Sequence, residues 1–339
     1  MHRYHRTGLA GRSMLTQTDL TREEFLRLVS LASQFQKEKW LRFRLSRLAG
    51  RRIVLIFEKA SAHSRSVFEA AAHDEGAYVT YLGPGESPLG RTESVKDTAR
   101  MLGRIFDGIE YRGFSQESVE ILAEYAGVPV WNELTDTWRP TQMLADVLTM
   151  RDHTAKPLEE VRYCYLGDGR NNTANSLQVT GALLGMDVRI CAPEALWPSP
   201  AVRGTAEHLA TGSGARLTVT SDIEAAVAGA DFIYTDRWLS MSEPAEEWDE
   251  RIGQLLPYQV NDKVLAATGN ASVKFLHCLP ALHNTDTEIG QQIYERHGLE
   301  ALEATEQVFE SPASVVFDQA RNRLHTIKAL MVATIPPRS

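Results

Sequence analysis

Cysteine is scarce in this sequence, and its spacing excludes two common uses. Only three cysteines occur among 339 residues, at Cys164, Cys191 and Cys278. They are too far apart to form a Cys-x-x-Cys metal pair, and an odd number of widely spaced cysteines gives no disulfide framework. A chain without such a framework suits a reducing compartment, so we expect a cytoplasmic protein.

Long apolar runs and a surplus of positive charge are also missing. No run of about 18 apolar residues occurs, so we expect no membrane span. The basic segment Met1–Arg6 is followed by no apolar stretch, which argues against a signal peptide. The formal charge of −8 argues against nucleic acid or an anionic membrane as a partner. What remains is a soluble globular protein long enough for two domains.

Short apolar runs alternate with helical patterns through both halves of the chain, which predicts an α/β fold of two doubly wound parallel-sheet domains. We expect a first domain at 1–150 and a second at 151–317, joined by a linking helix at 141–151. A C-terminal helix, 318–339, is expected to pack back on the first domain. The predicted strands are 52–57, 78–82, 108–111, 128–131, 162–166, 187–191, 216–220, 232–235 and 273–279. The predicted helices between them are 64–72, 94–102, 116–125, 172–184, 201–210, 223–228 and 260–267.

The first strand leads into a segment suited to holding an anion. The run 53–57 is apolar, and a helix rich in hydroxyl groups follows it after a short turn. Free N–H groups and the positive end of the helix dipole favour negative charge at such a helix start. Ser61, Ser64 and Arg65 add further hydrogen-bond donors there.

Other strands also end in polar residues, which predicts a small-molecule site at the rim of the sheets. These residues are Arg112, Asn172, Asp236 and Cys278. Taken singly, each has a simpler explanation: Asn172 would be part of a helix cap and Cys278 a small buried hydrophobe. A dinucleotide loop is not expected at Gly167, because the pattern's third glycine is replaced by Asn172.

Seven motifs in order, after the segment 57–66, resemble those of ornithine carbamoyltransferases in the aspartate/ornithine carbamoyltransferase family. They are Glu93–Arg100, Tyr111-Arg112-Gly113, Pro140–Asp146, Gly167–Asn172, Thr235–Met241, His277–Pro280 and Asn322–Thr326. The resemblance implies transfer of a carbamoyl group from carbamoyl phosphate to the side-chain amine of L-ornithine, which gives citrulline and phosphate.

The resemblance also assigns residues to the donor. Ser61 and Ser64, with the loop residues Ala62, His63 and Arg65, would bind the phosphate. Arg112 would bridge the phosphate and the carbonyl oxygen. Gln142, Arg323 and the backbone carbonyls of Cys278 and Leu279 would hold the carbamoyl NH2 end and the bound donor. Arg139 stands where the family has a histidine that polarises the carbamoyl oxygen, so it is also expected beside the donor.

On the acceptor side, the resemblance implies that Asn172, Asp236, Ser240 and Met241 hold the α-amino and carboxylate groups of the amino acid. Cys278, with Asp236 nearby, would face the attacking amine. No metal or organic cofactor is implied. The expected assembly is a homotrimer, in which the loop 87–91 of a neighbouring chain reaches the phosphate.

Five positions depart from the family pattern. Ala62 replaces a threonine, His63 replaces an arginine that binds phosphate, Arg139 replaces a histidine, and Ser242 replaces a glycine. Ser64 also replaces a threonine, which is a mild change. One positive charge is therefore lost at position 63 and another is gained at 139. Two alternatives follow: a relative in specialised metabolism with a different donor or acceptor, or a weakly active or non-catalytic ornithine-binding relative.

Overall fold

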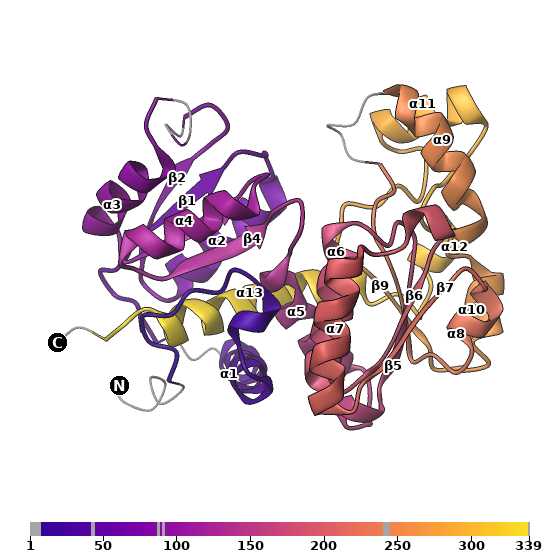
Figure 1. Ribbon diagram of the computed structural model, residues 1–339, viewed down its shortest axis with the longest axis horizontal. Coiled ribbons are helices and arrows are strands. Elements are labelled where there is room, and N and C mark those ends of the chain that lie inside the picture. Colours follow the sequence, from indigo (N-terminus) through magenta and orange to yellow (C-terminus); the bar gives the residue numbers. More distant parts are fainter. Residues whose placement is uncertain (1–7, 42–44, 87–88, 90–91, 240–244, 338–339) are drawn as a thin grey trace. The chain divides into compact units, whose positions relative to one another are not determined.

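The computed structural model describes residues 8–41, 45–86, 89, 92–239 and 245–337. The chain divides into two compact units. Unit 1 comprises Met1–Leu148 and Arg321–Ser339, and unit 2 comprises Thr149–Ala320. Each unit has one parallel sheet with helices around it (Figure 1). Among the described residues, no helix is both long and apolar enough to cross a bilayer.

Unit 1 contains a four-stranded parallel sheet in the order β2-β1-β3-β4. Its apolar cluster joins β1 and β3 to α3 and α4 through Val54, Ile109, Leu102 and Leu122. The strands are β1 (Arg52–Phe57), β2 (Tyr78–Leu82), β3 (Gly108–Arg112) and β4 (Val130–Leu134). The helices are α1 (Arg22–Trp40), α2 (Ala62–Asp74), α3 (Val95–Ile105) and α4 (Gln116–Ala126), with α5 (Pro140–Asp152) and α13 (Val316–Thr334) each containing a unit boundary.

Unit 2 contains a five-stranded parallel sheet in the order β7-β6-β5-β8-β9. The strands are β5 (Arg162–Leu166), β6 (Asp187–Cys191), β7 (Arg216–Thr220), β8 (Phe232–Thr235) and β9 (Lys274–His277). The helices are α6 (Asn172–Leu184), α7 (Pro200–Ser213), α8 (Ile223–Val227), α9 (Ala245–Leu255), α10 (Asp262–Ala267), α11 (Glu288–His297) and α12 (Glu306–Phe309). The predicted fold class, two α/β units with parallel sheets, is confirmed.

Several predicted element bounds need correction, and capping explains two of them. The helix expected at 64–72 begins at Ala62, because the Ser61 side chain accepts a hydrogen bond from the Ser64 N–H and so caps it. The helix expected from 260 begins at Asp262, because Asn261 is its cap.

Two strand predictions are also corrected. The strand expected at 128–131 lies at Val130–Leu134 and therefore includes Glu133. The strand expected at 273–279 ends at His277, two residues before Leu279, whose φ of 46° is incompatible with extended backbone. The helices α9, α11 and α12 were not predicted.

Both sheets have a topological switch point, where neighbouring strands lead to connections on opposite sides. In unit 1 it lies between β1 and β3, and in unit 2 between β5 and β8. Ligands in open parallel sheets bind beyond the carboxyl ends of the strands at such points. In unit 1, Ser61 and Ser64 follow β1 and Arg112 ends β3; in unit 2, Asn172 follows β5 and Asp236 follows β8.

The C-terminal half of α13 belongs to unit 1. The Trp131 indole N–H donates to the Thr334 hydroxyl over 3.0 Å, and the Gly11 N–H donates to the Thr334 carbonyl over 2.7 Å. These bonds tie the end of the chain to β4 and to the N-terminal segment. Arg323, two residues into this part of the helix, contacts Glu133 of β4 in the same unit.

Gly103 allows α3 to approach α4 closely, and its replacement is expected to destabilise unit 1. A Cβ atom at position 103 would lie 1.7 Å from the Ala126 carbonyl oxygen, a backbone atom that cannot rotate away. We expect Gly103→Ala to lower the free energy of unfolding by about 2–3 kcal/mol in urea melts. Gly204→Ala is the matched control, because no atom lies within 4 Å of a Cβ there; it is expected to be neutral or stabilising by up to about 1 kcal/mol. Equal effects of the two substitutions would contradict the packing argument.

Candidate functional site

Four residues that the resemblance assigns to the donor surround one buried carboxylate in unit 1, that of Glu133. The Ser64 hydroxyl donates to Glu133 Oε1 over 2.8 Å, and Arg323 Nη2 donates to the same oxygen over 2.7 Å. Arg112 Nη1 donates to Oε2 over 2.5 Å. Arg139 Nη2 lies 4.0 Å from Oε1. We call these five residues the Glu133 cluster.

The backbone of β4 directs Glu133 into this cluster. Tyr111 of β3 pairs with Asn132, whereas the next residue, Arg112, pairs with Leu134. Glu133 is therefore the extra residue of a β-bulge. A bulge changes the direction of a side chain relative to regular pairing, and bulges are frequent beside active sites. Arg112 ends β3 at the same level, which explains why the two side chains meet.

The charges of the cluster determine the protonation of Glu133. Burial opposes ionisation, but the nearby Arg112, Arg323 and Arg139 guanidinium groups outweigh it and hold the pKa of Glu133 well below its usual range. The neighbouring carboxyl group of Glu110 behaves oppositely. Burial, together with the charge of Glu133, raises the pKa of Glu110 well above its usual range. The cluster thus holds one carboxylate anion among three cations.

The start of α2 contributes Ser64 to the cluster, but its other predicted phosphate ligands point elsewhere or are exposed. Ser64 is buried, and the Ser61 hydroxyl donates to its oxygen over 3.2 Å. Ala62 and His63 are exposed on the first turn. Arg65 is also exposed; it donates to Glu69 over 2.8 Å and lies 3.9 Å from the Tyr81 ring centroid.

Gln142 lies buried in the first turn of α5, and only the NH2 group of its side-chain amide is hydrogen-bonded among the described residues. Its Nε2 donates to Asp146 Oδ1 over 2.7 Å, which fixes the orientation of the amide. Its Oε1 is buried and has no hydrogen-bond partner among the described residues. A buried carbonyl oxygen without a donor is uncommon in proteins. Gln142 can therefore accept a hydrogen bond from an N–H group of a ligand.

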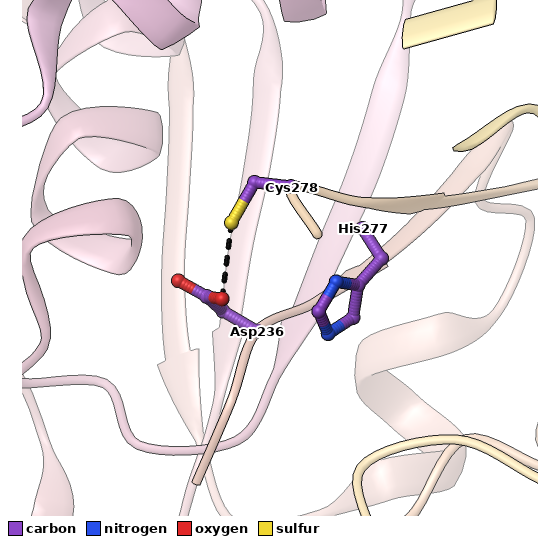
Figure 2. Close-up of side chains that lie close together, drawn as sticks. All are labelled: Asp236, His277 and Cys278. Carbon is purple, nitrogen blue, oxygen red and sulfur yellow. Dashed lines mark hydrogen bonds between the residues drawn. The ribbon is translucent and has the colours of Figure 1, made fainter. Parts of the chain in front are cut away.

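In unit 2, Asp236 links the residues that the resemblance assigns to the acceptor. The Cys278 Sγ–H donates to Asp236 Oδ1 over 3.0 Å, as Figure 2 shows. The Thr173 hydroxyl donates to Oδ2 over 2.6 Å, and it also lies 3.3 Å from the Asn172 amide oxygen. The ends of β8 and β9 and the start of α6 therefore meet at this carboxylate.

The segment after β9 has an unusual backbone at the predicted site. Leu279 is in the left-handed region, with φ 46°. Non-glycine residues in this region store strain and are found preferentially at functional sites. The Leu279 N–H donates to His277 Nδ1 over 3.0 Å, which fixes this conformation.

Within the described part of the chain, two groups of side chains have the chemistry to ligate a metal. Asp236, His277 and Cys278 offer ligand atoms within 4.8 Å of one another (Figure 2), as do His283, Glu306 and Glu310. In the first group, however, His277 Nδ1 accepts from the Leu279 N–H and the thiol donates to Asp236. Hydrogen bonds within the chain thus account for that arrangement.

Some of the site residues predicted from the sequence lie together in the structure, and others lie outside the described residues. Ser64, Arg112, Arg139 and Arg323 lie together, as do Asn172, Asp236 and Cys278. Ser240 and Met241, with Ser242 and most of the loop 87–91, lie outside the described residues. Sequence reasoning missed Glu133 and Thr173. A lone glutamate beside a buried apolar strand was the available signal for the first, and a threonine directly after Asn172 was the signal for the second.

Fold and geometry together define a two-unit parallel α/β protein with a candidate small-ligand site at each switch point. Two family models match the chain. The "Aspartate/ornithine carbamoyltransferase, carbamoyl-P binding domain" matches residues 12–152, and the "Aspartate/ornithine carbamoyltransferase, Asp/Orn binding domain" matches residues 159–334. The chain belongs to the aspartate/ornithine carbamoyltransferase family, which confirms the resemblance found in its motifs.

Relatives and solved structures agree over nearly the whole chain. A catabolic ornithine carbamoyltransferase of Rhizobium meliloti is 55% identical over 97% of this chain and 98% of its own length. The ornithine carbamoyltransferase of Haemophilus influenzae is 54% identical over 97% of this chain and 99% of its own length. Among structures, the ornithine carbamoyltransferase of Pyrococcus furiosus has a TM-score of 0.88 and 37% identity, covering 96% of this chain and 98% of that one.

Proposed function

We propose that this protein is a carbamoyltransferase that moves the carbamoyl group of carbamoyl phosphate to the side-chain amine of L-ornithine, giving citrulline and phosphate. Family membership over both domains supports this function, as do relatives named ornithine carbamoyltransferase at 54–55% identity. Residues 1–150 with 318–339 form the donor domain of this proposal, and residues 151–317 form the acceptor domain. Homotrimeric assembly stays a prediction from the resemblance, and a cytoplasmic setting stays a prediction from the cysteine usage.

The observation that carries the proposal is the convergence of Ser64, Arg112 and Arg323 on one carboxylate, that of Glu133. Two guanidinium groups and a hydroxyl around one point are a set of donors suited to an oxyanion. In the reaction, Arg112 stabilises the negative charge that develops on the carbonyl oxygen as the amine attacks. Gln142 accepts a hydrogen bond from the carbamoyl NH2 through its Oε1.

On the acceptor side, Asp236 binds the α-amino group of ornithine, and Asn172 contributes a further polar contact. Cys278 faces the attacking amine. The amine forms the new C–N bond while the bond to the phosphate oxygen breaks, and the departing phosphate takes the proton. A strong protein base is therefore not required, and much of the rate comes from positioning two substrates in line.

A direct assay tests this function. Purified protein, carbamoyl phosphate and L-ornithine are expected to yield citrulline and inorganic phosphate in equal amounts, and L-lysine replacing ornithine gives the measure of acceptor selectivity. Mass spectrometry of the amino acid product and a phosphate assay on the same sample provide the two readouts. Phosphate release without citrulline, or no product at any donor concentration, would contradict the proposal.

A second candidate is a relative that uses a different donor. The observation that favours it is the altered donor side: His63 is exposed, Arg139 is buried at 7% exposure, and a glutamate lies among the donor residues. Screening other carbamoyl donors with ornithine as the acceptor distinguishes the two candidates, because the second requires citrulline to form with another donor and not with carbamoyl phosphate.

A further inference from the structure

The Glu133 carboxylate is placed where a bound anion would be expected. Both of its oxygens accept hydrogen bonds, from Ser64 and Arg323 on one side and from Arg112 on the other. The side chain is fully buried. The resemblance assigns Ser64 and Arg112 to the phosphate and Arg323 to the carbamoyl end of the same donor, so the chain itself supplies a negative charge to its own donor site.

The cluster also retains two donors that Glu133 does not use. The Nε atoms of Arg112 and Arg323 are buried without a hydrogen-bond partner among the described residues. Outside the cluster, the acceptor Gln142 Oε1 is likewise buried without one. An ion-pair network built only to hold one carboxylate would leave few such atoms unsatisfied. The unused atoms indicate a ligand that contacts the same arginines.

We propose that Glu133 determines donor specificity: its carboxylate occupies the anion position of the donor site and competes with a doubly charged phosphate group. The inference rests on the proposed function and refines its substrate class. Carbamoyl phosphate binds by sharing or displacing the contacts of Glu133 with Arg112 and Arg323. A carbamoyl donor with less negative charge on its leaving group binds with less competition.

The charges of the cluster support this assignment. Arg112, Arg139 and Arg323 supply three positive charges, and ionised Glu133 cancels one of them. Like charges close together in a buried site strongly oppose each other. The bulge at β4 directs the carboxylate between the arginines rather than away from them. A glutamate at this position thus reduces the attraction of the site for a dianion.

The test measures anion binding separately from turnover. Inorganic phosphate is titrated calorimetrically into the wild-type protein and into Glu133→Gln, which keeps the shape and removes the charge. We expect phosphate to bind Glu133→Gln at least about tenfold more tightly. The KM for carbamoyl phosphate is expected to fall by a similar factor, while the KM for ornithine changes less than about twofold.

Glu110→Gln is the matched control. Glu110 is equally buried in the neighbouring strand, but it makes no hydrogen bond to the arginines and its raised pKa favours the uncharged acid. We expect it to alter phosphate affinity less than about twofold, because no charge is removed. Should Glu133→Gln not fold, Glu133→Asp draws the carboxylate back by one methylene, and it is expected to show a smaller gain in phosphate affinity.

The outcomes separate this inference from the proposed function. Unchanged or weaker phosphate binding in the Glu133 variants would overturn the inference, because Glu133 would then only position Arg112 and Arg323. Tighter phosphate binding without citrulline from any variant would uphold the inference and contradict carbamoyl transfer to ornithine. Citrulline formation by wild type, together with weaker phosphate binding by Glu133→Gln, would uphold the function alone.

Discussion

Replacing Arg112 with methionine is expected to lower kcat for citrulline formation by about 10²- to 10³-fold, the usual loss when one oxyanion donor is removed. Arg112 lies at the end of β3, and its guanidinium group reaches both Ser64 and Glu133. Methionine keeps much of the length and none of the charge. Steady-state kinetics at saturating ornithine gives the measurement, and a kcat within about threefold of wild type would refute the role of Arg112.

A control and a double variant separate chemistry from stability in that experiment. Arg47→Met removes another buried guanidinium of unit 1, paired with Glu75 over 2.9 Å, and it is expected to lower stability but not kcat. In Arg112→Met plus Glu133→Gln, the unpaired carboxylate is removed as well. Activity that stays low in the double variant shows that Arg112 acts on the donor, whereas recovery shows that it only neutralised Glu133.

Replacing Asp236 with asparagine is expected to lower kcat/KM for ornithine about 100-fold, mainly through KM. Asp236 is the acceptor of both the Cys278 thiol and the Thr173 hydroxyl, and its charge is the partner proposed for the α-amino group. Loss of one member of a buried charge pair typically costs about 2–5 kcal/mol. Kinetics with ornithine as the varied substrate measures the effect.

5-Aminopentanoic acid, which lacks the α-amino group, gives a sharper test of the same contact. The wild-type enzyme is expected to discriminate against it strongly, and Asp236→Asn much less, because the charge that recognises the missing group is gone. Asp168→Asn is the control. Asp168 is another buried carboxylate of unit 2, held by Arg251 over 2.8 Å, so its loss should affect stability rather than acceptor choice. Equal discrimination by wild type and Asp236→Asn would refute the assignment.

Most of the fold could be predicted because its strands are short apolar runs with clear ends. Strands β1, β5, β6 and β7 lie at their predicted residues. Helices α9 and α11 were missed because their sequences are mostly polar, with few apolar residues to reveal a buried face. β4 was predicted to end at Trp131 because Asn132 and Glu133 are polar, although both are buried.

The site could be predicted only in part, for a related reason. Motifs identified Ser64, Arg112 and Arg323, since each stands in a recognisable local pattern. Glu133 has no such pattern, because its role depends on a bulge in the pairing of β3 with β4. Pairing register is a tertiary property that local sequence does not specify. The exposure of His63 likewise depends on the cap at Ser61. Because of this cap, α2 begins at Ala62, two residues before the predicted start, and His63 lies in its first turn.

The bulge also has a consequence for how this protein could change over evolution. A residue in regular strand pairing contributes its backbone to the hydrogen-bond ladder and its side chain to the packing of one sheet face. Its replacement can therefore disturb both the pairing and the packing. Glu133 is the extra residue of the bulge, outside the one-to-one pairing of Asn132 with Tyr111 and Leu134 with Arg112. Position 133 can therefore change chemical character while the sheet keeps its neighbours in place. With the proposed role of Glu133, a single codon there offers a short mutational route between donor preferences within one unaltered scaffold.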